Sequence, residues 1–293
     1  MKQELLHTFK KSHFLKMSAD KRLIVQATAT QVNIFKNDTF QQLAQIKADN
    51  SEPFFSNDSS LLLIKESYKK LYVYEMETMA LYSKLRTSKG CYGNGEGACI
   101  SHDNKCVINI GYEHPHGFIS VYNIESGKEI RYREDMQEVY GNIQYIPSRK
   151  LYFINGYRRP NVSEKNKFFY LWFDHEKQTF EQTFCDLKGA GFLYSKLLDQ
   201  ILYYSQEGKS AFRFLPLNIE IPVEHKYETL NIELSHNNKM IALYHGKELK
   251  VCTFPNMEIL VDFPDMDYGR VSFSSDDKEI LIASHKGFIY KLN

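Results

Sequence analysis

Residues 272–293, SFSSDDKEILIASHKGFIYKLN, decide the fold. A serine and a short Asp/Lys turn lead into one apolar run, and a His-Lys-Gly turn leads into a second. Both runs are rich in Ile, Leu and aromatic residues and have about the length of one strand. The stretch therefore predicts two consecutive β-strands that follow a serine-containing turn.

The same pattern recurs along the whole chain. Seven polar turns precede apolar runs of strand length, and their anchor positions are Ser18, Ser56, Ser101, Ile146, Ser195, Ser235 and Ser274. The mean spacing of about 43 residues matches the ~40–45 residues of a four-stranded propeller blade. We therefore predict an all-β, seven-bladed β-propeller of four-stranded antiparallel blades, formed by residues 1–293 as a single domain.

The two ends of the chain complete this pattern. The seventh unit stops after its third strand, at FIYKLN, and an unassigned strand, QELLHTF, occupies residues 3–9. A bare third strand would be an exposed edge that invites aggregation. We predict that residues 3–9 form the outer strand of the last blade and close the ring.

Three stretches, SFSSDDKEILIASHKGFIYKLN, CISHDNKCVINIGY and GFISVYNIESGKEI, resemble the WD-repeat and related β-propeller families. Blades of those families carry a serine, a turn aspartate and a lysine before the second strand. The Gly-His and Trp-Asp pairs of WD repeats are missing, and the third strands end in Phe35-Lys36, Tyr74-Glu75, Tyr122-Asn123, Phe173-Asp174 and Phe254-Pro255. The resemblance implies mostly a role in protein interaction.

Composition narrows the function classes. The chain has 37 Lys and Arg against 36 Asp and Glu, and this balance does not favour a nucleic-acid binder. No run approaches the ~20 apolar residues of a membrane helix, and the start does not resemble a secretory signal, so we expect a cytoplasmic protein. Five cysteines without paired spacing predict neither disulfides nor a zinc site.

The two faces of such a propeller should differ. The short Ser/Asp/Asn/Lys turns share one face, and we interpret their aspartates as structural because Asp and Asn bond their own backbone. Longer loops share the other face, which we call the loop-rich face, and loops on a rigid scaffold usually carry binding residues. The candidate binding residues there are Tyr92, Tyr112, His114, His116, Tyr157, Arg158, Arg159, His245, His285 and Lys286.

One loop raises the question of a metal site. Glu113, His114 and His116 are plausible ligands for a transition metal, but the loop supplies no third and fourth ligand in a suitable geometry around Pro115. The glycines of CYGNGEG lack the helix that a phosphate loop requires. We therefore expect no metal and no cofactor.

The first strands of the blades alternate polar with apolar residues. In GNIQYI, NIELS and GRVSFS the polar positions are Asn142, Gln144, Asn231, Glu233, Arg270 and Ser272. Alternate residues share one side of a strand, so we expect these side chains to line the central channel. We also predict that Glu233 and Arg270, which belong to neighbouring blades, form an ion pair.

Two functions remain open. The first is a non-enzymatic scaffold that binds a protein or peptide partner on its loop-rich face, and no catalytic motif speaks against it. The alternative is an enzyme or small-ligand-binding propeller that uses the mouth of the channel, with Glu233 and Arg270 among its polar groups.

Overall fold

The computed structural model describes residues 2–66, 70–86, 97–113, 116–136, 138–158, 167–185, 190–207, 211–215, 219–222, 230–245, 247–264, 266 and 269–293. Within these residues the strands form seven four-stranded sheets, in agreement with the predicted four-stranded units. No helix in the described part has the length and apolar character needed to cross a membrane. The chain divides into two compact units.

Unit 1 comprises Met1–Pro53, Ser195–Gln200 and Val223–Asn293. It contains three antiparallel sheets. They are β2 (Phe14–Met17), β3 (Leu23–Ala27), β4 (Gln31–Lys36) and β5 (Gln42–Lys47); β22 (Leu230–Leu234), β23 (Met240–His245), β24 (Glu248–Thr253) and β25 (Ile259–Phe263); and β26 (Arg270–Phe273), β27 (Glu279–Ala283), β28 (Gly287–Leu292) and β1 (Gln3–Phe9).

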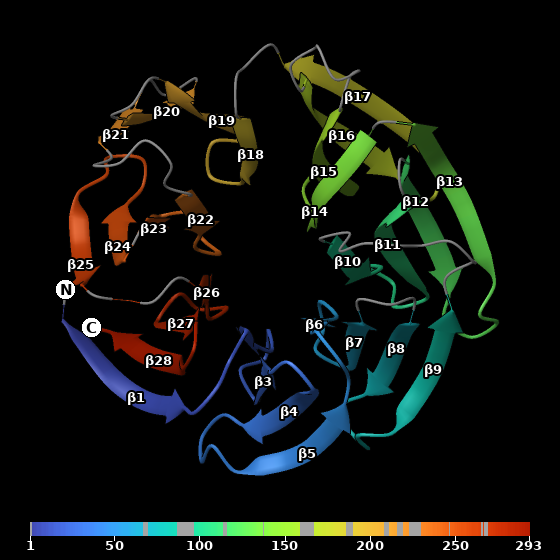
Figure 1. The fold of residues 1–293 in the computed structure, drawn as a ribbon, viewed down its shortest axis with the longest axis horizontal. Helices are drawn as coiled ribbons and strands as arrows, with labels where there is room; N and C mark the ends of the chain where they lie inside the picture. The colour runs from blue at the N-terminus through green and yellow to red at the C-terminus, as the bar shows by residue number, and fades with distance from the viewer. Residues whose placement is uncertain are drawn as a thin grey trace. The chain divides into compact units, whose positions relative to one another are not determined.

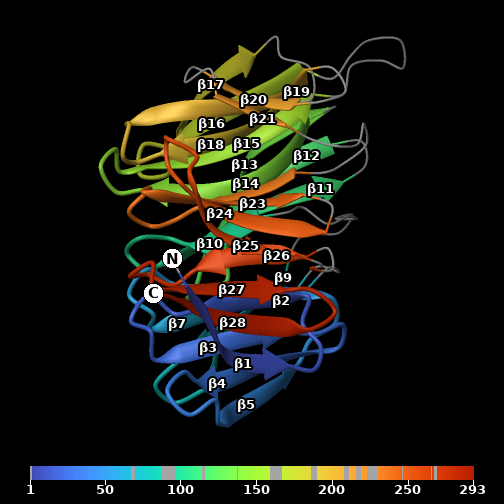
Figure 2. The same cartoon turned by 90° about the vertical axis from the view of Figure 1, so that its left-hand side faces the viewer.

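Strand β1 is the outer strand of the last sheet, beside β28 (Figures 1 and 2). Its antiparallel register runs from Gln3 opposite Leu292 to Phe9 opposite Gly287. The two chain ends continue the pairing, because Lys2 and Asn293 exchange backbone hydrogen bonds of 3.0 and 2.9 Å. The predicted pairing of residues 3–9 with the last sheet is therefore confirmed.

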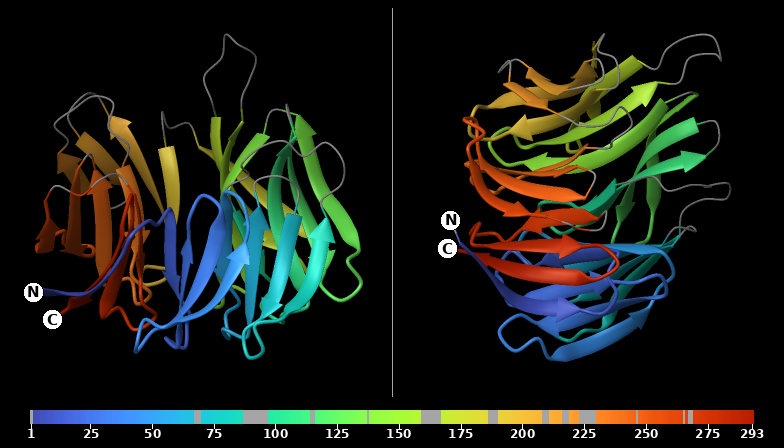
Figure 3. Two further views of the ribbon diagram at one scale, coloured as in Figure 1. Left: turned by 60° about the horizontal axis from the view of Figure 1, so that its bottom comes forward. Right: turned by 60° about the vertical axis from the view of Figure 1, so that its left-hand side comes forward.

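Unit 2 comprises Phe54–Tyr194 and Ile201–Pro222. Its four sheets follow one another along the chain, and Figure 3 shows their strands side by side. They are β6 (Ser51–Phe55), β7 (Leu61–Glu66), β8 (Lys70–Glu75) and β9 (Leu81–Arg86); β10 (Gly97–Ile100), β11 (Cys106–Glu113), β12 (His116–Asn123) and β13 (Glu129–Met136); β14 (Glu138–Ile146), β15 (Leu151–Arg158), β16 (Lys167–Asp174) and β17 (Thr179–Cys185); and β18 (Ala190–Ser195), β19 (Gln200–Glu207), β20 (Ala211–Leu215) and β21 (Ile219–Pro222).

The hydrophobic cores lie between consecutive sheets. In unit 1, Phe273 and Ile280 pack with Val251 and Val261 of the preceding sheet. In unit 2, the sheets β10–β13 and β14–β17 share a core that includes Ile108 and Phe169. The second strands β3, β7 and β27 are buried on both of their faces, which is why they read as nearly continuous apolar runs in the sequence.

Several outer strands carry a β-bulge. The register shifts by one residue in the pairs β4/β5, β8/β9, β12/β13, β24/β25 and β28/β1. A bulge adds an unpaired residue and increases the local twist, which limits edge-to-edge association. The bulges repeat, so they belong to the common design of the sheets.

Candidate functional site

The serine turns form a repeated hydrogen-bonded motif. Each serine hydroxyl is buried, accepts a hydrogen bond of 2.8–3.1 Å from the backbone N–H five residues later, and donates one of 2.6–3.0 Å to the Asp or Asn two residues later. The serines concerned are Ser18, Ser56, Ser101, Ser235 and Ser274. The hydrogen bonds stabilise the ionised form of the aspartate, as Asp58 shows. Desolvation alone would raise the pKa of Asp58, but hydrogen bonds from Ser56, Ser60 and Asn104 lower this pKa to about 2. The turn aspartates are therefore structural, as predicted.

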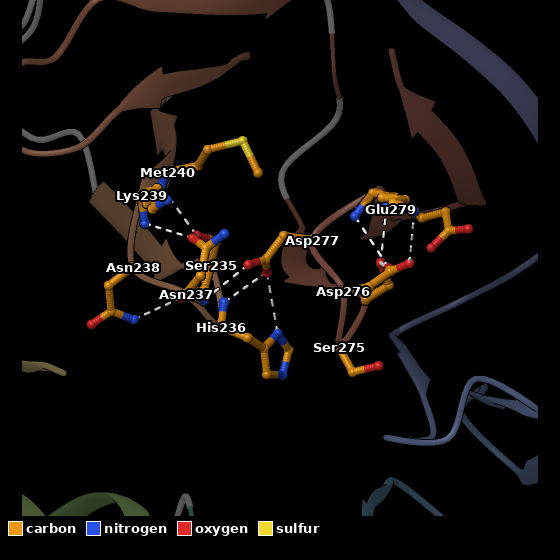
Figure 4. A network of polar contacts seen from close by, with 12 residues as sticks. Ser235, His236, Asn237, Asn238, Lys239, Met240, Ser275, Asp276, Asp277 and Glu279 are labelled. Atoms are coloured by element: carbon orange, nitrogen blue, oxygen red, sulfur yellow. Dashed lines mark hydrogen bonds and ion pairs between the residues drawn. The ribbon is translucent and has the colours of Figure 1, made fainter. Parts of the chain in front are cut away.

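In several turns the residue after the turn Asp or Asn links the turn to the preceding sheet. Asp277, which has a φ of 60°, accepts hydrogen bonds from the backbone N–H groups of His236 (2.7 Å) and Asn237 (2.9 Å) in the turn between β22 and β23 (Figure 4). Its carboxylate also lies 3.4 Å from Nδ1 of His236. Desolvation lowers the pKa of His236, although the charge of Asp277 opposes this shift.

The same link is made elsewhere with other side chains. Asn238 accepts hydrogen bonds from the backbone N–H groups of Lys196 and Leu197 in the preceding turn. In unit 2, Nδ2 of Asn104 donates to Asp58 at 2.7 Å. These side chains thus bond to neighbouring turns and stabilise the contact between consecutive sheets.

The candidates on the loop-rich face are only partly described. Tyr92, His114 and Arg159 lie outside the described residues. The backbones of Tyr112, His116 and His245 belong to β11, β12 and β23, but their side chains are outside the description. The structure thus gives side chains only for the remaining four, Tyr157, Arg158, His285 and Lys286.

These four side chains occupy strand ends opposite the serine turns. Tyr157 and Arg158 end β15 and are half-buried, and the ring of Tyr157 lies 5.8 Å from that of Phe168. His285 and Lys286 form the exposed turn between β27 and β28. The first pair belongs to unit 2 and the second to unit 1, so each pair is described within its own unit.

One prediction about the channel residues on the inner strands is wrong. Arg270 does not pair with Glu233; its guanidinium forms an ion pair of 2.7 Å with Glu52. Glu52 and Arg270 both stand four positions before the turn serine of their repeat, whereas Glu233 stands two positions before its own. Two residues span about 7 Å along a strand. Glu233 and Arg270 therefore lie at different levels along the direction of the strands.

The charge that acts on Glu233 is that of Lys16 instead. Both residues stand two positions before their serine, on inner strands of unit 1. Desolvation by the surrounding protein raises the pKa of Glu233 to about 7, although the charge of Lys16 opposes this shift. Ser272, at the same height on β26, donates a hydrogen bond of 3.1 Å to the carbonyl oxygen of Leu15.

The remaining channel candidates lie on β14 and β22. The side chains of Asn142 and Gln144 are exposed, and the backbone N–H of Asn142 donates to Oδ1 of Asn155 at 2.8 Å. The side chain of Asn231 is outside the description. Sequence reasoning missed Lys16 and Glu52, although the alternation in FLKM and SEPFF carries the same signal.

Other reactive groups show no assembled centre in the described part of the chain. No group of three His, Cys, Asp or Glu side chains there is arranged to hold a metal ion. The four cysteines that the structure describes, Cys99, Cys106, Cys185 and Cys252, are free thiols. Burial raises the pKa of Cys99 to about 12, which makes its thiolate inaccessible at neutral pH.

Comparison with known proteins establishes the fold. No protein-family model matches the sequence, and no curated protein does. The structure is similar to the crystal structure of the β-propeller domain of Cps50 (Swd1) from Myceliophteria thermophila, with a TM-score of 0.74, 11% identity and 100% of both chains covered. The chain is thus an all-β propeller of four-stranded antiparallel blades, and at this identity the similarity shows the fold alone.

Proposed function

We propose that the seven sheets are the blades of one closed, WD-repeat-like propeller spanning residues 1–293, with β1 completing the last blade. In this proposal the protein is a non-enzymatic cytoplasmic scaffold that binds a protein or peptide partner on its loop-rich face. The support is the contrast between the two ends of the strands. Side chains of the serine turns bond to one another, whereas Tyr157, Arg158, His285 and Lys286 at the opposite ends are half-buried or exposed.

Residue types at the loop-rich face fit this role. Tyr and Arg are enriched in binding hot spots because they combine a large contact area with directed hydrogen bonds. His285 and Lys286 extend from a two-strand turn whose backbone is fixed by β27 and β28, so binding would cost little ordering of the chain.

The experiment is a comparison of partners captured by the tagged protein in its own cells. We expect Arg158→Glu combined with Arg159→Glu to remove the main partner while circular dichroism shows that the protein remains folded. The matched control, Lys105→Glu with Lys128→Glu, reverses two exposed charges in serine-side turns and should leave the partner set intact. If the arginine variant retains every partner, this loop is not the contact.

A second candidate function is small-ligand binding at the inner strands of unit 1. The observation that favours it is the group of Lys16, Glu233 and Ser272, which stand two positions before their serines on inner strands of unit 1 and in which the pKa of Glu233 is raised to about 7. A thermal-shift screen of small metabolites tests it. Compounds that stabilise the wild type and fail to stabilise Glu233→Gln would support a ligand site, and a screen without such compounds would count against it.

A further inference from the structure

The sheet β6–β9 carries a surface that differs from the loop-rich face. On the side of β8 and β9 that faces away from the shared core, alternate positions hold Tyr72, Tyr74, Leu81, Tyr82, Lys84 and Arg86, which we call the Tyr-Lys face. The intervening residues Leu71, Val73 and Leu85 are buried in the core with the next sheet. Strand alternation thus separates a structural side from an outer side.

The register brings these side chains into one strip. Tyr72 stands opposite Lys84, and Tyr74 stands opposite Leu81. The bulge between Leu81 and Ser83 turns Tyr82 to the same side, where it is 52% exposed beside Leu81 at 49%. The ammonium group of Lys84 lies 5.6 Å from the centroid of the Tyr72 ring, within reach of a cation–π contact.

The cations of the strip have no acidic partner among the described residues. Lys84 and Arg86 are exposed, and neither forms an ion pair in that part of the chain. The neighbouring Lys70, by contrast, is paired with Glu66 at 3.2 Å. The strip therefore has a positive end at Lys84 and Arg86 and an apolar end at Leu81 and Tyr82.

The register gives the counterparts of Lys84 in two other sheets with a bulge at the same place. Counted from the bulge, they are Gln45 in β5 and Asp262 in β25. Gln45 is neutral and donates a hydrogen bond of 2.6 Å to Gln31. A positive charge at this position is therefore not a requirement of the repeated fold.

Strand β9 is also the edge of its sheet. Beyond the bulge, the residues 83–86 continue the ladder with β8 without a further shift. The outer backbone N–H and C=O groups of such an edge can pair with an added extended strand, and alternate side chains of that strand then determine specificity.

We propose that the Tyr-Lys face binds an acidic extended peptide as a fifth strand along β9. Two carboxylates at alternate positions of the peptide would meet Lys84 and Arg86, and an apolar residue two positions further would pack on Leu81 and Tyr82. The inference goes beyond the loop-rich face and does not depend on it, because it concerns another surface and another kind of contact.

A peptide fits better than a nucleic acid. The strip ends at the turn that holds Glu75 and Glu77, which would repel a phosphate backbone. Two unpaired cations also give little of the multiple phosphate neutralisation on which nucleic-acid affinity depends.

The test is a fluorescence-polarisation titration of the full-length protein at 50 mM salt. The probe is a labelled nine-residue peptide with two glutamates and one leucine at successive alternate positions and serine or threonine elsewhere. We expect saturable binding below about 1 mM, a loss of about tenfold or more in Lys84→Glu/Arg86→Glu, and a loss of about fivefold in Tyr82→Ala. Methylating the peptide backbone nitrogens should abolish binding, since it removes the strand hydrogen bonds.

Controls make the outcome decisive. Lys105→Glu/Lys128→Glu makes the same change in net charge elsewhere and should bind the probe as the wild type does. Lys84→Gln/Arg86→Gln keeps the test valid if the charge reversal impairs folding. The proposal is overturned if the probe does not bind, if a lysine-for-glutamate peptide binds as well, if the two variants at Lys84 and Arg86 retain full affinity, or if a single-stranded oligouridylate binds more tightly than the peptide.

Discussion

The serine turns and the Tyr-Lys face both consist of exposed polar segments at the margins of four-stranded sheets, yet they differ in how their side chains are used. In the turns, Asp277 and Asn238 bond to the backbone of the preceding turn, and the motif recurs from sheet to sheet. On the Tyr-Lys face, Lys84 and Arg86 extend from β9 without an ion pair in the described residues, and the counterparts of Lys84 in β5 and β25 are Gln45 and Asp262. A polar feature that repeats serves the fold, and one that occurs in a single sheet is free to serve recognition.

The largest expected effect on stability concerns β1, the N-terminal strand that completes the last sheet. Deleting residues 2–9 removes the strand that pairs with β28, the buried Phe9 and the stacking of His7 on Phe40 at 4.1 Å. Burial of one phenylalanine alone contributes about 1.5–3 kcal/mol, so we expect unfolding free energy to fall by about 3 kcal/mol or more. Urea denaturation measures this. Leu5→Ala, at an exposed position of the same strand, should change little, and unchanged stability after the deletion would contradict the pairing.

A smaller effect is expected at Asp277. Asp277→Ala leaves the backbone N–H groups of His236 and Asn237 without their acceptor and places alanine at a φ of 60°. The loss should be about 1–3 kcal/mol in urea denaturation, because the two backbone donors lose their acceptor and left-handed backbone is unfavourable for alanine. Asp277→Asn keeps an acceptor oxygen and tolerates that backbone, so it should lose much less. Equal losses in the two variants would show that the hydrogen bonds are not the cause.

The smallest effect is a change in pH dependence at Glu233. Its pKa in the folded protein, about 7, exceeds its ordinary value of 4.5. The folded state therefore holds the proton more tightly, and the associated stability is present below about pH 4.5 and is lost as the pH rises to 7. Glu233→Gln should gain stability relative to the wild type between pH 5 and pH 8. Glu125→Gln, at an exposed turn, serves as the control, and a difference that is constant with pH would contradict the assignment.

Much of the fold could be predicted from the sequence because its signals are local. Serine turns and apolar runs fix the second strand of each sheet, and residues 3–9 match β1 from end to end. The predicted ion pair between Glu233 and Arg270 was wrong. Alternation indicates on which side of a strand a residue lies, but not its level along the strand relative to a neighbouring sheet. Counting back from Ser235 and Ser274 would have placed Arg270 level with Glu52 and Glu233 level with Lys16.

The Tyr-Lys face could not be recognised in advance for a different reason. LYVY and LYSKLR show the alternation of half-buried strands, but the sequence does not indicate which lysines find a carboxylate across the ladder. Lys70 does, through Glu66, and Lys84 does not. That distinction depends on the registers of β7 with β8 and of β8 with β9, which only the structure supplies.

The division between structural turns and a recognition surface is tested most directly by one comparison of unfolding free energies. We predict that Lys84→Glu/Arg86→Glu stays within about 0.5 kcal/mol of the wild type, as surface changes usually do, while Asp277→Ala is destabilised several times more. If the charge reversal on β9 destabilises the protein as much as the loss of Asp277, then Lys84 and Arg86 support the fold, and the division between the two regions is wrong.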